Sequence, residues 1–205
     1  MRKLQALALA LPFLLVMGCQ EQSATGVSGD QALAQQQDVL ASQGQPGKLL
    51  PLQGNVSGGV TGQTFAPGFP VTRDDFGGRC SVPSDWVIEF TVTGPLSHLG
   101  QATVVAEHCS QIDFLTGAAT YGDGMLRVIA ANGDELWGSY DNGTSAPNSA
   151  TEAWFLDTFI LSGGTGRFAN AAGGGTEWGT VDLGSFDIDM EMRGVISYDA
   201  SDRRH

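Results

Sequence analysis

The chain is poor in positive charge. Its 205 residues contain 10 Lys and Arg against 22 Asp and Glu, which gives a formal net charge of −12 at pH 7. Lys3 and Lys48 are its only lysines. An acidic surface repels phosphate backbones and anionic lipid head groups. We therefore expect no nucleic-acid partner, and we expect any membrane attachment to depend on a covalent lipid.

Recognisable catalytic and ligand-binding motifs are also scarce. The chain has no Gly-x-Ser-x-Gly sequence, and its three histidines offer few general bases. The glycine-rich stretch 163–166 lacks the Lys-Ser/Thr ending of a phosphate-binding loop. Asp187, Asp189 and Glu191 share one strand face but lie too far apart along it for calcium, so we interpret them as a solvated face. We expect no metal and no cofactor.

The N-terminal segment has the pattern of a secretory signal. Arg2 and Lys3 precede an apolar run over residues 4–17, which is short for a membrane span but suits a signal peptide. The Val-Met-Gly-Cys sequence that ends at Cys19 resembles the bacterial lipobox, which implies cleavage just before Cys19 and acylation of its thiol. Gln20 stands where an inner-membrane retention Asp would stand, which favours the outer membrane. The alternative is an ordinary signal peptide with an incidental cysteine.

The two remaining cysteines form an even pair. If Cys19 is lipidated and the chain exported, Cys80 and Cys109 are left together in an oxidising compartment, where a disulfide is expected. It would close a loop of about 30 residues, for an idealised stabilisation of roughly 3–4 kcal/mol. A metal site with His108 is the alternative, but the repeated Cys/His spacing of structural zinc is missing.

Composition divides the chain into four segments. They are a signal peptide (1–18), a flexible Gln-, Ser-, Ala- and Gly-rich tether that begins with the lipidated cysteine (19–48), a β-barrel domain (49–200) and a tail (201–205). Prolines and glycines punctuate the start of the domain, so we expect only fragments of strand before Trp86.

From there on, apolar residues alternate with polar ones. Trp86, Ile88, Phe90 and Val92 would line one face of a strand. Asn-Gly at 132–133 predicts a hairpin turn, and the segments 122–124 and 141–143 have the composition of further turns. The clearest pattern comes last, where one face would hold Phe186, Ile188, Met190, Met192 and Ile196. We predict an all-β domain of seven to eight antiparallel strands in a closed or nearly closed barrel; a two-sheet sandwich is the alternative.

Three short blocks give a family likeness. Gly94–Gly100 (GPLSHLG), Gly163–Phe168 (GGTGRF) and Ala171–Gly173 (AAG) resemble the bacterial proteins of the allene oxide cyclase barrel-like group. Plant dirigent proteins share a related Gly-Gly-Thr-Gly-x-Phe segment. The resemblance covers residues 85–197 and implies an eight-stranded barrel with an apolar interior. It brings no activity with it, because the catalytic residues of the plant cyclase have no counterparts that we can match here.

Arg167 and Phe168 follow the glycines of the second block. We expect this stretch to hold one helical turn that covers a barrel end, with Phe168 inserted and Arg167 at the rim.

Candidate site residues are few. His98, at a turn-to-strand junction, is a weak candidate for a general acid or base, and a structural role suits it better. Glu107 and His108 are adjacent and would point to opposite faces, so without a bulge only one of them can enter the interior, and we expect Glu107 to be exposed. Side chains that could line a ligand cavity are Trp86, Phe90, Met125, Trp154, Met190 and Met192. An interior filled by side chains is the alternative.

These observations favour an exported, lipid-anchored protein of the bacterial cell envelope. Its barrel would bind a small apolar ligand or an envelope partner without catalysis. The alternatives are a cyclase- or isomerase-like enzyme that holds an apolar substrate in the barrel, and a structural envelope protein. The sequence does not indicate the ligand, the oligomeric state or the membrane leaflet.

Overall fold

The structure is a computed structural model, and it describes residues 48–66 and 76–198. The signal peptide, Cys19, nearly all of the tether and the tail lie outside the described residues. Within them, no helix is long and apolar enough to cross a membrane.

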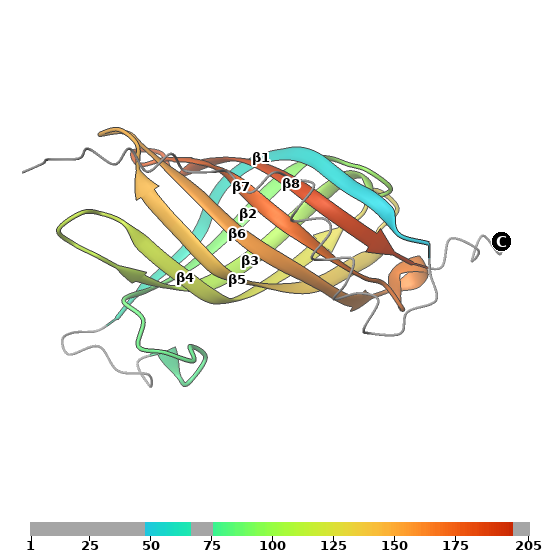
Figure 1. The fold of residues 1–205 in the computed structure, drawn as a ribbon, viewed down its shortest axis with the longest axis horizontal. Helices are drawn as coiled ribbons and strands as arrows, with labels where there is room; N and C mark the ends of the chain where they lie inside the picture. The colour runs from blue at the N-terminus through green and yellow to red at the C-terminus, as the bar shows by residue number, and fades with distance from the viewer. Residues whose placement is uncertain (1–47, 67–75, 199–205) are drawn as a thin grey trace, which may run out of the picture.

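Eight antiparallel strands form one closed barrel (Figure 1). Each strand pairs with the next in sequence, and β1 pairs with β8 to close the sheet. The strands are β1 (Leu50–Phe65), β2 (Trp86–Leu96), β3 (Gly100–Ile112), β4 (Ala119–Ile129), β5 (Glu135–Pro147), β6 (Glu152–Gly164), β7 (Ala172–Asp182) and β8 (Asp187–Ser197). The predicted antiparallel eight-stranded barrel is confirmed.

The expectation of only fragmentary strand before Trp86 is wrong. β1 is a continuous strand of 16 residues that pairs with both β2 and β8. Its glycines permit close approach of neighbouring strands: a Cβ at Gly58 would collide with the carbonyl oxygen of Thr91. Glycine in this segment therefore serves strand packing rather than breaking the strand.

Two segments that we expected to be turns are bulges inside strands. Asp123 lies within β4 and Asn142 within β5, and both have positive φ, 51° and 56°. At these points the register of β4 against β3, and of β5 against β6, shifts. Turn-forming residues also suit bulges, because both need unusual backbone angles. Each bulge changes which residues of its strand face the interior.

One end of the barrel is closed by the short 3₁₀ helix η2 (Gly166–Phe168), drawn in orange in Figure 1. Phe168 is 0 % exposed and belongs to the main core, whereas Arg167 remains partly exposed. The inserted phenylalanine, the rim arginine and the single helical turn agree with the sequence expectation. The apolar face of β8 also points inward as predicted, with Met190 and Met192 buried.

The segment before β2 is fixed to the outside of the barrel by a disulfide. Cys80 and Cys109 are bonded, with their Cα atoms 5.9 Å apart, so the predicted disulfide is confirmed. Both are buried in a small cluster with Val87, against which Phe76 packs. The bond attaches the segment to the outer face of β3, beside the end of the barrel opposite η2.

Candidate functional site

A cavity of about 160 Å³ lies inside the barrel, at the end where β2, β4, β6 and β8 begin. All eight strands contribute to its wall, which is mostly apolar. The lining residues are Val60, Trp86, Ile88, Phe90, His108, Ser110, Ile112, Gly117, Ala119, Tyr121, Tyr140, Ser145, Ala153, Phe155, Asp157, Glu177, Val181, Leu183, Phe186 and Ile188. The interior is therefore not completely filled by its own side chains.

Two carboxyl groups lie deep in this cavity. Asp157 on β6 is 3 % exposed and Glu177 on β7 is 2 % exposed. Both occupy inward positions, and a hydrogen bond joins their carboxyl groups. Carboxylates are rarely buried to this degree, so the pair is the least expected feature of an otherwise apolar barrel.

Three ring side chains surround the carboxyl pair. Tyr121 donates a hydrogen bond of 2.8 Å from its hydroxyl to Asp157 Oδ2. The imidazole of His108 stacks on the Tyr121 ring, with ring centroids 4.4 Å apart. A further hydrogen bond of 2.7 Å joins His108 Nδ1 to the hydroxyl of Tyr140. The polar groups thus form one connected cluster of five residues from β3, β4, β5, β6 and β7.

Burial controls the charge of this cluster. It raises the pKa of Asp157 to about 7, although hydrogen bonds from Tyr121 and Glu177 oppose the rise. Burial and the nearby Asp157 raise the pKa of Glu177 well above its usual range. Burial, with the positive charge of Arg79, lowers the pKa of His108 to about 3. Near neutral pH the histidine is therefore uncharged, and the raised pKa values of the two carboxyl groups favour retention of a proton by the pair.

The bulges and their glycines place the two tyrosines. Tyr121 pairs across the sheet with Gly143, and Tyr140 with Gly124. A Cβ at Gly143 would collide with the Tyr121 ring, and one at Gly124 would lie 2.7 Å from the Tyr140 ring. Each tyrosine therefore lies over a glycine of the neighbouring strand, which leaves room for its ring inside the barrel.

The structure distributes the predicted lining residues over three environments. Trp86 and Phe90 line the cavity. Met190 and Met192 are buried in the core but are not part of the cavity wall. Met125 is 60 % exposed and Trp154 is 38 % exposed, on the outer face, so neither can line the cavity. After the bulge at Asp123, the even-numbered residues of β4 face inward, so Met125 faces outward. In β6 the odd-numbered residues face inward, so Trp154 faces outward.

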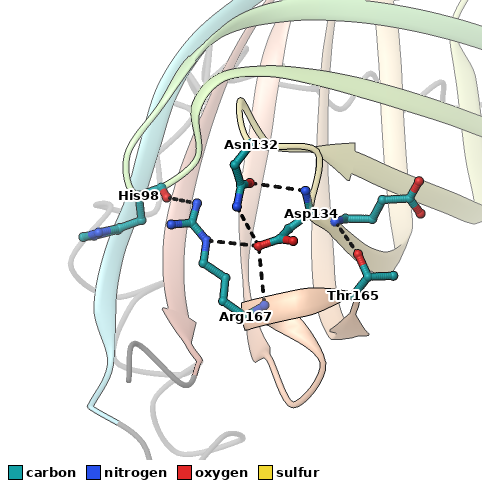
Figure 2. Close-up of polar contacts among 6 residues, drawn as sticks. His98, Asn132, Asp134, Thr165 and Arg167 are labelled. Carbon is teal, nitrogen blue, oxygen red and sulfur yellow. Dashed lines mark hydrogen bonds and ion pairs between the residues drawn. The ribbon is translucent and has the colours of Figure 1, made fainter. Parts of the chain in front are cut away.

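His98 lies at the closed end of the barrel, in the turn between β2 and β3 (Figure 2). Its backbone carbonyl accepts a hydrogen bond of 2.8 Å from Arg167 Nη2. Arg167 also lies 3.8 Å from Asp134, whose carboxylate accepts from Asn132. His98 has a positive φ of 67° and no place in the cavity wall, so its contacts are those of a turn residue.

Most of the polar cluster was not predicted from the sequence. Only His108 was considered for the interior, and it is the member of the Glu107–His108 pair that enters, while Glu107 forms an ion pair with Arg79 at 2.8 Å. A usable signal existed for Asp157, because it stands between Phe155 and Phe159 in an alternating strand. A carboxylate at such an inward position indicates a functional site.

Among the described residues, no group of three or more His, Cys, Asp or Glu could hold a metal ion. The chain matches no protein-family model, and a search of the curated proteins finds no match.

Proposed function

We propose that this is an exported, lipid-anchored envelope protein whose barrel binds a small, mainly apolar molecule in its interior cavity. The observation that carries the proposal is an apolar cavity with a few convergent polar groups at its deep end, the usual form of a small-molecule site. The Cys80–Cys109 disulfide supports export, since such bonds persist in oxidising compartments. The resemblance to the allene oxide cyclase barrel-like group implies an apolar barrel interior, which is compatible with this proposal.

The size of the cavity limits the ligand. Drug-sized ligands occupy sites of roughly 300–1,000 Å³, whereas an engineered cavity of about 150 Å³ in another protein binds benzene. At about 160 Å³, this cavity fits a molecule of one ring with a small substituent. A larger ligand would have to extend out of the barrel end.

A direct test is a titration of the full chain with toluene, followed by amide chemical shifts. We expect saturable shifts at cavity residues such as Ile88, Phe155 and Val181, and none at the closed end near His98. Shifts spread over the outer surface, or no saturation, would contradict the proposal.

Catalysis is the second candidate, and the polar cluster favours it. A carboxyl group with a pKa of about 7 is suited to act as a general base, and Tyr121 donates to it at 2.8 Å. An isomerase or cyclase needs such a group beside a confined apolar substrate. Acetophenone deuterated at its methyl group tests this: wild-type protein should exchange the deuterium faster than Asp157→Asn. Equal rates would count against catalysis by Asp157.

A further inference from the structure

Two oxygens in the cavity accept no hydrogen bond from outside the carboxyl pair. Asp157 Oδ1 and Glu177 Oε2 are buried, and apart from the hydrogen bond that joins the two carboxyl groups, neither meets a donor among the described residues. Both residues line the cavity. An unpaired buried acceptor costs free energy, which a ligand with N–H or O–H groups would recover. The pair therefore presents two oxygens to a bound molecule.

The charge around these oxygens favours a cation. The polar groups that face the pair are His108 from β3, Tyr121 from β4 and Tyr140 from β5. Apart from the indole N–H of Trp86, which is buried and has no partner among the described residues, the neighbouring lining side chains of β1, β2 and β8 are apolar, and the described lining contains no Lys or Arg. Arg79, whose positive charge lowers the pKa of His108, is already paired with Glu107 outside the barrel. A ligand cation would supply the missing positive charge.

The walls favour an organic cation over a metal ion. Five aromatic side chains line the cavity, namely Trp86, Phe90, Tyr121, Tyr140 and Phe155. Aromatic faces attract ammonium groups, and the attraction is stronger where water is excluded. Calcium needs six to eight oxygen ligands, and two free carboxyl oxygens do not provide them.

We propose that the cavity takes a small organic ammonium ion, with one ring or a short aliphatic body, whose N–H groups bind the free oxygens of Asp157 and Glu177. This inference rests on the proposed function, since it identifies the chemical class of the ligand in the same cavity. The ammonium group lies at the deep end, and the apolar body fills the space toward Ile88 and Leu183.

Calorimetry on the full chain with four probes of one size tests the ligand class. The probes are benzylamine, benzyl alcohol, toluene and benzoate, at about pH 8 and about pH 5. At the higher pH, benzylamine should bind about tenfold or more tightly than toluene, because its hydrogen bonds are charge-assisted. Benzoate should bind most weakly. The preference for benzylamine should shrink at about pH 5, where the carboxyl group of Asp157, with its pKa of about 7, carries a proton and the amine is still charged.

The variant Asp157→Asn tests whether the preference for benzylamine depends on the Asp157 carboxylate. It should lose most of the preference for benzylamine and keep its affinity for toluene, whereas Glu89→Gln, on the outer face of β2, should behave as wild type. If Asp157→Asn does not fold, the four probes and the two pH values on wild-type protein still decide the question. Toluene binding with no preference for benzylamine overturns this inference and leaves the proposed function intact. Failure of all four probes to bind overturns both.

Discussion

At the scale of single residues, the polar cluster sets the chemistry of the cavity. Asp157 lies in a regular stretch of β6, and simple alternation would have placed it inside. Tyr121 and Tyr140 could not be placed in this way, because the bulges at Asp123 and Asn142 reverse the alternation within their strands. His98 stood out in the sequence because it is a histidine in a family-like block, yet it belongs to the turn that Arg167 holds.

The carboxyl pair makes stability depend on pH. The folded-state pKa of Asp157 is about 7 and exceeds its unfolded value of 3.8, so the folded state binds the extra proton between these values. The contribution of Asp157 to the free energy of unfolding is therefore most favourable below pH 3.8, and it falls as the pH rises to about 7. Glu177 acts in the same direction, because its pKa is also raised.

We predict that Asp157→Asn combined with Glu177→Gln removes this loss. Between about pH 5 and about pH 8, the free energy of unfolding of wild-type protein should fall more than that of the double variant, by about 3 kcal/mol from Asp157 alone. Urea unfolding at both pH values measures the difference, and the contribution of His108 cancels in the comparison. Glu89→Gln with Asp189→Asn, both on the outer face, is the control. Parallel pH profiles of wild type and the cavity variant would refute the assignment.

At the scale of elements, glycines and the disulfide position the strands. The strand β1 was not predicted because its glycines suggested loop, although they serve close packing against β2. The hairpin at 132–133 was predicted correctly from Asn-Gly, since its turn has a strong local signature. Bulges and turns share residue types, so the sequence could not separate them at Asp123 and Asn142.

Gly143→Ala should disturb the site from outside the cavity lining. The new Cβ would meet the Tyr121 ring and push its hydroxyl from Asp157, at a cost of about 1–3 kcal/mol as in other overpacked sites. Thermal unfolding and toluene binding measure the two effects. Gly184→Ala is the control, because the nearest atom to its Cβ is a carboxylate oxygen of exposed Asp182 at 3.3 Å. Unchanged stability and binding in Gly143→Ala would count against this role of the glycine.

The disulfide should contribute to stability of the whole barrel. Cys80→Ala with Cys109→Ala should lower the free energy of unfolding by roughly 3 kcal/mol, because the bond closes a loop across 29 positions. Chemical unfolding with and without a reducing agent measures this. The reductant should destabilise wild-type protein and leave the double variant unchanged; an equal response of both would exclude the disulfide as the cause.

At the scale of the whole molecule, the period-two alternation predicted the all-β class, and the short connections predicted a barrel. The cavity could not be predicted in the same way, because whether eight strands leave an interior space depends on how their side chains pack. Its lining combines small residues, such as Gly117, Ala119 and Ala153, with large ones, such as Trp86 and Phe155, and this combination becomes visible only in three dimensions.

Attachment to the membrane is predicted to depend on one thiol. In a bacterial host grown with labelled palmitate, wild-type protein should take up the label and partition with membranes. Cys19→Ser should do neither, and Cys80→Ala with Cys109→Ala should still be labelled. Label in Cys19→Ser would show that acylation occurs elsewhere.

The most direct test of the central claim is to fill the cavity. Ala119 lines it at the start of β4, and Ala119→Leu would occupy much of the space, whereas Ala146→Leu adds the same atoms on the outer face of β5. Toluene affinity should fall by about tenfold or more in Ala119→Leu and stay at the wild-type value in Ala146→Leu. Equal affinity in both variants would mean that the molecule binds elsewhere, and the barrel interior would not be the binding site.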